Sequence, residues 1–515
     1  MYLTQTLHQA MQQEPDRILT VDGDRTRTVS ETVARVAQLA GALQSLGVGS
    51  GDRVGMLGLN SDRYHDYLLG VPWADAVLNP VNHRWSPAEV SYALGESGTR
   101  VLLVDEHFTE TAREMRTQCP TLESVVFYGN GTCPDDMLDG ERLISEAVSV
   151  EDARRGGEDL FGIFYTGGTT GEPKGVMLSH DAVLMNVLGT LATGDWLSSQ
   201  GRMLRVAPMF HLADICIGIC GLFQGSTHVF VQSFTPEGVL RLLEEQRITD
   251  VLLVPTMLQM MVEHVDAAAR DLAGVHHLLY GTSPMSESLL DRCKAIFPNA
   301  KFAQAYGMTE LAPIATILRA VDHEDPVLCR SAGRAAPHAE VRIVDAGDEE
   351  VPRGTVGEII VRGDHMMSGY WQRKEETATA LRGGWMHTGD AGYMDDRGYV
   401  FVVDRIKDMI VSGGENVYSA EAENALMKHP AVVACAVIGV PDEQWGERVH
   451  AVVVAQPDVT LTIEDLREFC REHIAPYKAP RSMETVNALP LSGAGKILKR
   501  KLRDQYWPEK GRQVG

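Results

Sequence analysis

Strand-like and helix-like segments alternate along most of this chain, and this alternation constrains the fold more than any other feature. Residues 30–46 and 64–74 have the apolar spacing of helices. Short apolar runs typical of buried strands occur at residues 54–59, 101–104, 250–254, 276–280 and 340–344. Strand, helix, strand units of this length are typical of mainly parallel sheets with helices packed on their faces. The chain is therefore predicted to be an α/β protein.

The last part of the chain is predicted to be a separate, smaller α/β domain. Its expected strands and helices are 432–438, 450–455, 420–428 and 463–473. The polar segment Asp404–Lys407 precedes it and is too short for a flexible tether, so it is interpreted as a hinge. The predicted division is a large N-terminal domain, 1–404, with parallel and mixed sheets flanked by helices, and a small mobile domain, 405–515.

Charge and cysteine content exclude several classes of protein. The chain has 47 basic and 70 acidic residues, a net charge of −23, which disfavours binding to nucleic acid or anionic lipid. The 8 cysteines form no CxxC pair and no Cys/His cluster with zinc spacing, which favours a reducing, cytoplasmic location. The first residues lack the pattern of a secretory signal, and the longest apolar stretch, 212–223, is too short for a transmembrane helix.

The segment 164–175, FYTGGTTGEPKG, is the most informative for function. Its glycines allow backbone N–H groups to turn toward an anion, its threonines add hydroxyl donors, and its lysine adds a positive charge. It does not match the Walker A pattern, because the lysine follows a proline. The alternative is a plain Gly/Thr-rich hairpin. The candidate phosphate-binding residues are Thr166, Gly167, Gly168, Thr169, Thr170 and Lys174.

Together with four further motifs, this segment resembles the adenylate-forming superfamily of acyl-CoA synthetases, adenylation domains and luciferases. The further motifs are QAYGMTE (304–310), HTGD (387–390), DRIKD (404–408) and SGAGKI (492–497). All five occur in the family's order, and the resemblance runs from about Ser30 to Arg503. It implies the adenylate-forming enzyme fold and the acid–CoA ligase branch. It also implies ATP, Mg²⁺ and coenzyme A as co-substrate.

The implied reaction has two steps. A carboxylate attacks the α-phosphate of ATP, giving acyl-AMP and pyrophosphate, and a thiol then displaces AMP. A carboxylate is a poor acyl donor, whereas AMP is a good leaving group. No protein nucleophile is needed, so the barrier is expected to fall through positioning and charge neutralisation.

In the large domain, the resemblance gives roles to residues around the nucleotide. Tyr306 would stack on adenine, Thr309 would contact the α-phosphate, and Glu310 would hold Mg²⁺. The alternative for Glu310 is a charge at a helix N-terminus. Other residues that match the nucleotide site are Gly281, Thr282, Ser283 and Gly307. Thr282-Ser283 differs from the family's commoner Gly-Ala or Gly-Glu.

In the small domain, Lys496 would reach the substrate carboxylate and the α-phosphate, and it is predicted to be catalytic. Its alternative is a solvated position in the basic run KILKRKLR. Asp390 would accept hydrogen bonds from the ribose hydroxyls, with Arg405 nearby. Lys407 falls at the family's hinge.

Coenzyme A is expected to approach a different part of the small domain. Gly413 and Gly414 would line the thiol tunnel, or else form a plain strand-to-helix turn. Trp445 would pack near the coenzyme, or else in the core. Two departures from the family have predicted consequences. Ser419 replaces a common proline and is predicted to be a harmless N-cap. Asp75 replaces a common glycine and would tolerate a positive φ.

His211, in PMFHLAD, matches a wall of the family's acyl pocket and is interpreted either as a positioning residue there or as a hydrogen-bonded histidine at a helix start. Asp214 is interpreted as a helix N-terminal charge rather than a substrate contact. The other expected walls are 254–258, Gly281, Gly307, Met308 and Ala312–Pro313, mostly apolar. This favours an apolar monocarboxylic acid, fatty or aromatic.

Four functions remain open from the sequence. They are an acid–CoA ligase, a stand-alone ligase that loads the pantetheine arm of a carrier protein, a luciferase-like oxidase and a non-catalytic nucleotide-binding protein. The presence of Thr309, Glu310, Asp390 and Lys496 argues against the last. Expected partners are a small carboxylic acid, ATP, CoA, and a lysine acetyltransferase acting on Lys496. The protein is expected to be a monomer or a homodimer.

Overall fold

The computed structural model describes residues 1–166, 172–194, 196–282, 285–413, 415–457, 459–491 and 497–507. The chain divides into two compact units. Unit 1 is Met1–Glu340 with Val361–Met386, and unit 2 is Val341–Ile360 with His387–Gly515. This division does not fall between residues 404 and 405, and a hinge there stays a prediction.

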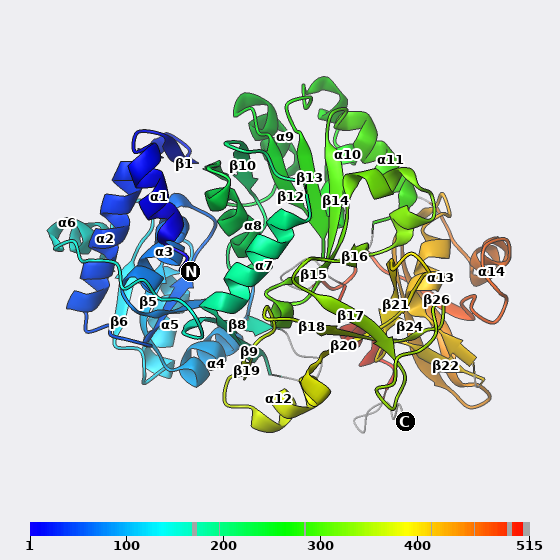
Figure 1. Ribbon diagram of the computed structural model, residues 1–515. Coiled ribbons are helices and arrows are strands. Elements are labelled where there is room, and N and C mark those ends of the chain that lie inside the picture. Colours follow the sequence, from blue (N-terminus) through cyan, green and yellow to red (C-terminus); the bar gives the residue numbers. More distant parts are fainter. Residues whose placement is uncertain are drawn as a thin grey trace. The chain divides into compact units, whose positions relative to one another are not determined.

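A nine-stranded sheet forms one layer of unit 1 (Figure 1). In spatial order its strands are β16 (Arg334–Ala335), β15 (Ile314–Leu318), β14 (Lys301–Gly307), β13 (His277–Gly281), β12 (Asp250–Leu253), β10 (Arg202–Arg205), β11 (Thr227–Phe230), β1 (Ile18–Asp22) and β2 (Arg25–Thr28). The six strands from β14 to β1 are parallel, as the alternation of the sequence predicts. Helices α9 (Pro236–Glu245), α10 (Pro255–Glu263) and α11 (Glu287–Ile296) cover one face and share a buried apolar core with it.

An eight-stranded sheet forms a second layer of unit 1. Its order is β19 (Gly369–Tyr370), β9 (Lys174–Ser179), β8 (Leu160–Thr166), β4 (Val77–Pro80), β3 (Arg53–Leu57), β5 (Thr99–Val104), β6 (Ser124–Phe127) and β7 (Leu138–Asp139). Successive residues of β5 face opposite sides. Leu102 and Val104 pack on α4 (Pro87–Ser97) and α5 (Thr109–Gln118), whereas Leu103 faces α2 (Val29–Ser45).

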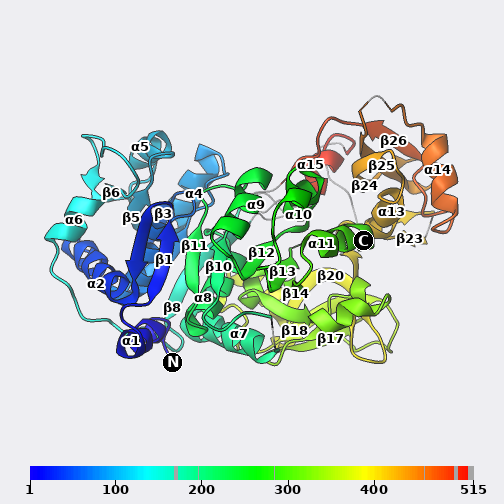
Figure 2. The ribbon, with the colours of Figure 1, turned by 90° about the horizontal axis from the view of Figure 1, so that it is seen from above.

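Two helices lie between these sheets, as Figure 2 shows from above. Helix α7 (His180–Ala192) contacts β8 and β9, helix α8 (Leu212–Phe223) contacts β10 and β11, and the two helices contact each other. Both helices are buried along most of their length, and α8 is partly exposed mainly in its last turn. The sheet edges described below are therefore held by a rigid core.

The predicted helix at 30–46 is confirmed by α2, and its ends follow from local chemistry. Thr28 caps the helix by accepting a hydrogen bond from the Glu31 N–H, while the Glu31 carboxylate accepts one from the Thr28 N–H. At the other end, Gly47 has φ +84°, a conformation that glycine adopts without strain. The predicted positive φ of Asp75, +65°, is also confirmed.

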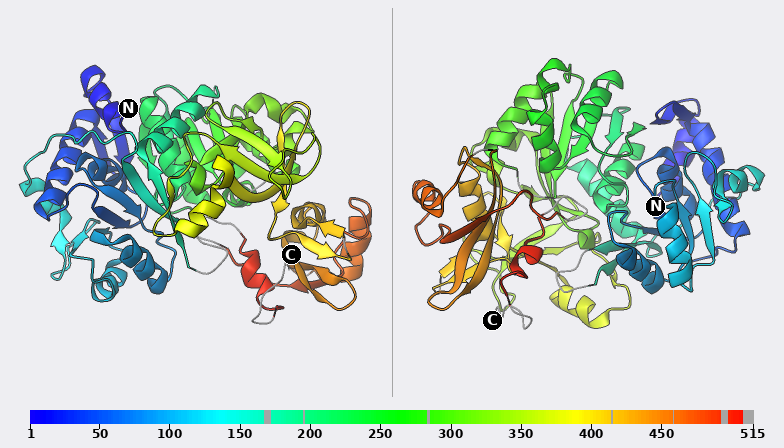
Figure 3. Two further views of the ribbon diagram at one scale, coloured as in Figure 1. Left: turned by 60° about the horizontal axis from the view of Figure 1, so that its bottom comes forward. Right: turned by 180° about the vertical axis from the view of Figure 1, so that it is seen from behind.

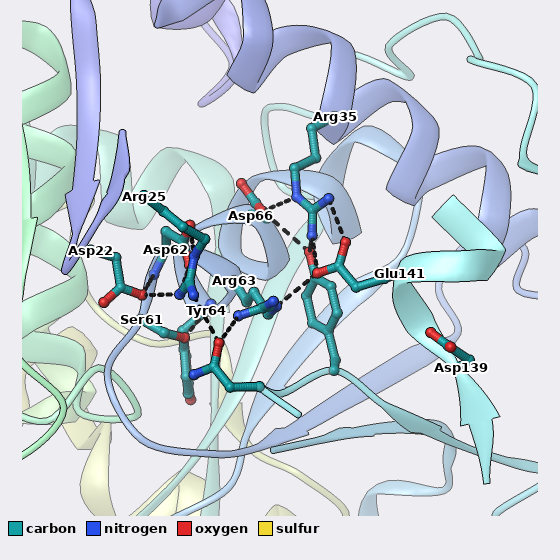
Figure 4. Close-up of polar contacts among 12 residues, drawn as sticks. Asp22, Arg25, Arg35, Ser61, Asp62, Arg63, Tyr64, Asp66, Asp139 and Glu141 are labelled. Carbon is teal, nitrogen blue, oxygen red and sulfur yellow. Dashed lines mark hydrogen bonds and ion pairs between the residues drawn. The ribbon is translucent and has the colours of Figure 1, made fainter. Parts of the chain in front are cut away.

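A partly buried ionic network joins the β1–β2 hairpin to α2, α3 (Asp62–Trp73) and α6 (Gly140–Glu146) (Figure 4). Arg25 bridges Asp22 and Asp62 at 2.6 and 2.9 Å. Arg35 of α2 binds Asp66 of α3 at 2.6 Å and Glu141 of α6 at 2.8 Å. Asp62 and Asp66 are buried and both also pair with Arg27, so removal of one arginine would leave buried negative charge that is only partly compensated.

Unit 2 contains two further sheets. The four-stranded sheet has the order β17 (Glu340–Val344), β18 (Gly357–Arg362), β20 (Met386–Met394) and β21 (Val400–Arg405). The other sheet has the order β23 (Glu415–Val417), β22 (Ile410–Ser412), β25 (Gly446–Ala455) and β24 (Val432–Asp442), with β26 (Ser482–Thr485) also paired to β25. The predicted elements at 420–428, 432–438, 450–455 and 463–473 are all confirmed within a few residues.

Helices cover both faces of this second sheet of unit 2. Helices α13 (Ser419–Leu426) and α14 (Ile463–Arg471) pack on one face, and α15 (Lys499–Arg503), red in Figure 3, contributes Leu502 to the other. The predicted N-cap role of Ser419 is wrong. Tyr418 is the N-cap, and Ser419 is the first helical residue, fully buried, with its side chain bonded to Asp404 and Lys499.

Among the described residues, no helix combines the length and the apolar character that crossing a bilayer requires.

Candidate active site

Candidate functional residues gather where the parallel strands of the nine-stranded sheet end. β10, β12, β13 and β14 are neighbours, and their carboxyl ends meet at one edge of the sheet. In parallel α/β sheets, ligands bind at this edge. The residues that follow these strands are His211, Val254, Thr282, Thr309 and Glu310.

Two predicted nucleotide-site glycines in unit 1 are required by close packing. A Cβ atom on Gly281 would lie 2.5 Å from the carbonyl oxygen of Ala305, and one on Gly307 would lie 2.0 Å from that of Pro313. Both distances are far below ordinary contact, so any larger residue would push the backbone away from the strand ends. Glycine at these positions keeps β13, β14 and the following turn close together.

Thr282 has an unusual backbone. Its φ is +67°, in the left-handed region that β-branched residues rarely adopt. This explains why the family's commoner residue at this position is glycine. The Thr282 side chain is half-buried, and backbone strain of this kind is typical of functional sites.

Glu310 is connected to the predicted phosphate-binding segment by one tyrosine. Glu310 is 7% exposed, and its carboxylate accepts a hydrogen bond from the Tyr370 hydroxyl, Oη to Oε1, at 2.8 Å. The Lys174 ammonium lies 5.1 Å from the centre of the Tyr370 ring and pairs with Glu376. Burial and the neighbouring Glu310 charge raise the pKa of Tyr370, so its hydroxyl keeps its proton at neutral pH.

This connection crosses between the two sheets of unit 1. Tyr370 belongs to β19, whose partner β9 begins at Lys174, whereas Glu310 lies in the turn Thr309–Leu311 after β14. The sequence did not predict Tyr370, because its partner Glu310 lies 60 positions earlier and no local pattern links them.

The hairpin β8–β9 sets the ends of the Gly/Thr-rich segment. Thr166 and Lys174 are paired directly across it. Two of the predicted phosphate-binding residues are therefore neighbours across the hairpin. The remaining predicted residues Gly167, Gly168, Thr169 and Thr170, like Ser283, Gly414 and Lys496, lie outside the described residues.

Tyr306 and Thr309 flank Gly307 at this same edge. Tyr306 is paired with Thr316 of β15 and is half-buried, and Thr309 begins the turn that carries Glu310. Their adenine and phosphate roles stay predictions.

His211 is the N-cap of α8. Its Nδ1 accepts a hydrogen bond from the Ala213 N–H at 3.3 Å, which is the helix-start role left open by the sequence. The loop that leads to it is held by Asn60. The Asn60 amide donates to the carbonyls of Arg205 and Ala207 at 3.2 and 2.8 Å, and its carbonyl accepts from the Met209 N–H at 2.9 Å.

Asp214 has a partner that the sequence did not predict. It lies in the first turn of α8, as expected, but it is buried and bound by the buried Arg205, whose Nε lies 3.2 and 3.1 Å from the two carboxylate oxygens. Arg205 also approaches Nδ1 of His228 at 3.1 Å. A Cβ on Gly218 would lie 2.4 Å from Nη1 of Arg205, so glycine makes room for the guanidinium.

In unit 2, Asp390 and Arg405 face each other across β20 and β21. They are register partners, and Nε of Arg405 lies 3.2 Å from Oδ1 of Asp390. Asp390 is 9% exposed. Lys407 follows in an exposed turn, in which the Asp408 and Met409 N–H groups donate to the Arg405 carbonyl. The sequence predicted the proximity of Asp390 and Arg405, and the structure has it.

Gly413 and Trp445, both predicted to lie near the coenzyme, are in contact in unit 2. Gly413 has φ +63° in the turn between β22 and β23, and its N–H donates to the Trp445 carbonyl at 2.8 Å. A Cβ on Gly413 would lie 2.7 Å from the Trp445 ring. Arg481 also packs on this ring, with its guanidinium 3.8 Å from the ring centre. The turn joins two strands, so the alternative interpretation of Gly413 as part of a plain strand-to-helix turn is wrong.

Comparison with known proteins is consistent with this arrangement. The family model described as AMP-binding enzyme matches residues 7–371, and the model described as AMP-binding enzyme C-terminal domain matches residues 421–496. The chain belongs to the AMP-binding enzyme family. It is an adenylate-forming ligase of the superfamily that includes acid–CoA ligases, and its mixed α/β fold with a small C-terminal domain is the fold of that superfamily.

Similar members of the family use different acceptors. The chain is 39% identical to a feruloyl-CoA synthase from Amycolatopsis sp over 94% of this chain and 95% of the relative. It is 35% identical to the fatty acid–[acyl-carrier-protein] ligase ScoC from Streptomyces coeruleorubidus over 99% and 98%. The solved structure of the amide bond synthetase McbA from Marinactinospora thermotolerans is 29% identical, with a TM-score of 0.87 over 98% and 100% of the chains.

Proposed function

We propose that this AMP-binding enzyme is an acid–CoA ligase that acts on an apolar monocarboxylic acid. A carboxylate oxygen attacks the α-phosphorus of ATP, and the bond to the β-phosphate oxygen breaks, releasing pyrophosphate. The CoA sulfur, having lost its proton, then attacks the acyl carbon. The acyl–oxygen bond breaks, and AMP leaves with the electron pair.

The contact between Tyr370 and Glu310 carries this proposal. It holds the Glu310 carboxylate at the strand ends, near the Lys174 side of the phosphate-binding segment. A triphosphate needs positive charge on its outer phosphates and a metal near its inner ones, which the Lys174 ammonium and a metal held by Glu310 would supply.

Mg²⁺ fits Glu310. The buried carboxylate of Glu310 is oriented by the Tyr370 hydroxyl at one oxygen, and carboxylate oxygens are the ligands that Mg²⁺ prefers. When bound, the metal would neutralise charge on the phosphate oxygens. Thr309, next to Glu310, is assigned to the α-phosphate, and Tyr306 to the adenine ring.

Residues of unit 2 complete the proposed machinery. Asp390, with Arg405 beside it, would accept hydrogen bonds from the ribose hydroxyls. Lys496 is assigned to neutralise charge as the carboxylate attacks the α-phosphate. Gly413, Gly414 and Trp445 are assigned to the pantetheine arm, and Lys407 is assigned to the hinge of the small domain.

The buried pair of Arg205 and Asp214 supports an apolar acid. An amino-acid substrate would need a carboxylate for its ammonium group, and a dicarboxylate would need a second cation. Asp214 is neutralised by Arg205, and the guanidinium is likewise occupied by Asp214. The pair therefore adds no net charge close to His211, which caps the same helix.

A carrier-protein thiol is the second candidate acceptor. The similarity to ScoC, a fatty acid–[acyl-carrier-protein] ligase, over 99% of this chain favours it. Pantetheine is common to CoA and carrier proteins, so both acceptors would use the same tunnel.

ATP-dependent pyrophosphate release across a panel of acids tests the proposal. The panel spans acetate to palmitate, benzoates, cinnamates, dicarboxylates and amino acids, each with and without CoA. Turnover that needs both CoA and one apolar class of acid is the expected result. The enzyme could instead form one equivalent of acyl-AMP that CoA does not discharge. If a phosphopantetheinylated carrier protein discharges it, the acceptor is the carrier protein rather than CoA.

A further inference from the structure

Lys499 is a buried cation in a run of basic residues. It begins α15, three positions after Lys496, and its side chain is 13% exposed. Its ammonium lies 2.7 Å from Oε1 of Glu423 and donates to the Ser419 hydroxyl at 2.6 Å. The interpretation of the KILKRKLR run as a solvated face is therefore wrong for this residue.

The Lys499 contacts continue to the end of β21. The Ser419 hydroxyl, which accepts from Lys499, donates to Oδ2 of Asp404 at 2.7 Å, and the Ser419 N–H donates to the same oxygen. Asp404 directly precedes Arg405, the partner of Asp390. A chain of hydrogen bonds thus connects Lys499 with the start of the predicted hinge segment, 404–408.

A second anchor joins the same helix to the other end of that segment. Arg503, one turn after Lys499 on α15, forms an ion pair with Asp408. The two basic side chains therefore hold α15 to both ends of residues 404–408. Both Arg503 and Asp408 are largely buried, at 14% and 19% side-chain exposure, so solvent screens the pair less than it would a surface pair.

The charges around Lys499 make its removal costly. Burial lowers the pKa of Lys499, but the carboxylates of Glu423 and Asp404 outweigh it, so its pKa is raised and the ammonium stays charged. Glu423 also accepts a hydrogen bond from the Val437 N–H, which ties the cluster to β24. Without Lys499, two acidic side chains would share a buried space without a cation.

The residues on either side of 492–496 are joined to each other. Leu491 and Ile497 form an antiparallel bridge, and the Leu498 N–H donates to the Pro490 carbonyl at 2.8 Å. Residues 490–491 and 497–498 are thus held together, and Lys499 directly follows Leu498.

We propose that Lys499 is a positioning residue for Lys496, acting through its buried contacts with Ser419, Glu423 and, through Ser419, Asp404. Arg503 is its second anchor. The pair fixes the origin of the Lys496 segment relative to the hinge segment 404–408, so that both move as one piece. This inference rests on the adenylation step of the proposed function, not on CoA as the acceptor.

The test compares Lys499→Met, which removes the charge, with Lys499→Arg, which keeps it. ATP–pyrophosphate exchange reports adenylation, using the best acid among ferulate, benzoate and decanoate. Discharge of supplied acyl-AMP by CoA reports the second step. Lys499→Met is expected to lower the kcat of exchange by about 10-fold or more, with KM for ATP and acid changed less than about 2-fold. Lys499→Arg is expected to keep most of the activity, and discharge of acyl-AMP to stay near wild type.

A double variant separates positioning from a general structural role. On a Lys496→Ala background, Lys499→Met should cause no further loss of exchange, because the residue through which it acts is absent. Lys501→Met, an exposed position on the same helix, is the matched control and should leave both steps unchanged. Equal loss of both steps by Lys499→Met, an added loss on the Lys496→Ala background, or wild-type exchange would overturn the inference.

Hydrogen–deuterium exchange keeps the inference testable if the wild-type protein adenylates none of the three acids, which would instead count against the proposed function. Amide exchange in peptides spanning 489–498 should be faster in Lys499→Met than in wild type or Lys501→Met at the same degree of folding. Identical exchange in all three proteins would overturn the inference whatever the activity.

Discussion

Tyr370 donates a hydrogen bond to Glu310 at 2.8 Å, and this contact joins the two large sheets of unit 1 at the proposed metal-binding carboxylate. The tyrosine comes from the edge of the eight-stranded sheet, and the glutamate from a turn that leaves the nine-stranded sheet. One side chain thereby fixes both the orientation of the carboxylate and its distance from the phosphate-binding hairpin.

Replacing Tyr370 by phenylalanine should weaken adenylation. The ring remains, but the buried carboxylate loses a donor, which costs about 1.5–3 kcal/mol for a charged partner. We expect a roughly 10- to 100-fold lower rate of pyrophosphate exchange and a higher Mg²⁺ concentration at half-maximal rate. Titration of Mg²⁺ checks this. Tyr477→Phe, at an exposed tyrosine, is the control, and equal Mg²⁺ curves for Tyr370→Phe and wild type would contradict the prediction.

Thr282→Gly should stabilise the protein. Glycine adopts φ +67° without strain, so the substitution removes a local cost of about 1–3 kcal/mol, partly offset by about 0.5–1 kcal/mol of added freedom in the unfolded chain. Thermal unfolding should show a higher Tm. Thr282→Ala keeps a Cβ at the same φ and is expected to gain less. A Tm of Thr282→Gly at or below that of Thr282→Ala would contradict strain at this position.

The sequence predicted the fold well because apolar periodicity is a local property. The strands around 54–57, 101–104 and 250–253 and the helix at 29–45 are confirmed within a few residues. The resemblance to the family also implied that Arg405 lies near Asp390, and the two side chains form an ion pair.

The contacts that the sequence missed all join residues on different elements. Arg205 and Asp214 lie 9 positions apart, on a strand and on a helix, and the interpretation of Asp214 as a helix-end charge could not include its partner. Serine is a common N-cap residue. The Ser419 hydroxyl is instead hydrogen-bonded to Asp404 and Lys499, which lie 15 and 80 positions away in the sequence. Such pairings depend on packing, which no local pattern encodes.

Asn60→Leu should affect acid binding more than ATP binding. The variant leaves the carbonyls of Arg205 and Ala207 and the Met209 N–H without their buried partner, a loss of about 2–4 kcal/mol for three hydrogen bonds. The loop that leads to His211 would then shift. We expect a higher KM for the acid, an unchanged KM for ATP and a lower Tm.

The control for Asn60 is Asn299→Leu, at an exposed asparagine in the same unit. Steady-state kinetics of pyrophosphate release with acid and ATP varied separately give both constants. An equal rise in both KM values for Asn60→Leu would mean that the whole unit is disturbed rather than the acid side of the site.

The Asp22 carboxyl should make stability fall as pH rises through about 6. Burial, followed by the hydrogen bond and charge of Asp62, raises the pKa of Asp22 to about 6. The stability that this shift contributes is fully present below about pH 4, the pKa of this carboxyl in the unfolded chain. It is lost as the pH rises through the pKa in the folded protein. Burial also acts on Asp62, but Arg25 and Arg27 outweigh it and lower its pKa to about 2, so Asp62 stays ionised in this window.

Thermal or denaturant unfolding at pH 5 and pH 7.5 measures the Asp22 effect. Asp22→Asn should reduce the difference in the free energy of unfolding between the two pH values by about 1–3 kcal/mol. Asp24→Asn, at an exposed carboxyl in the same hairpin turn, is the control and should leave the difference as in wild type. Parallel pH profiles for wild type and Asp22→Asn would contradict the assignment.

The space that Gly218 leaves for Arg205 has a consequence for which substitutions these positions tolerate. A guanidinium at position 205 needs both a carboxylate at 214 and a missing side chain at 218, since a methyl group there would collide with it. A side chain added at 218 should therefore be tolerated only when the guanidinium at 205 is removed, and removal of that guanidinium would leave the buried carboxylate at 214 without its cation.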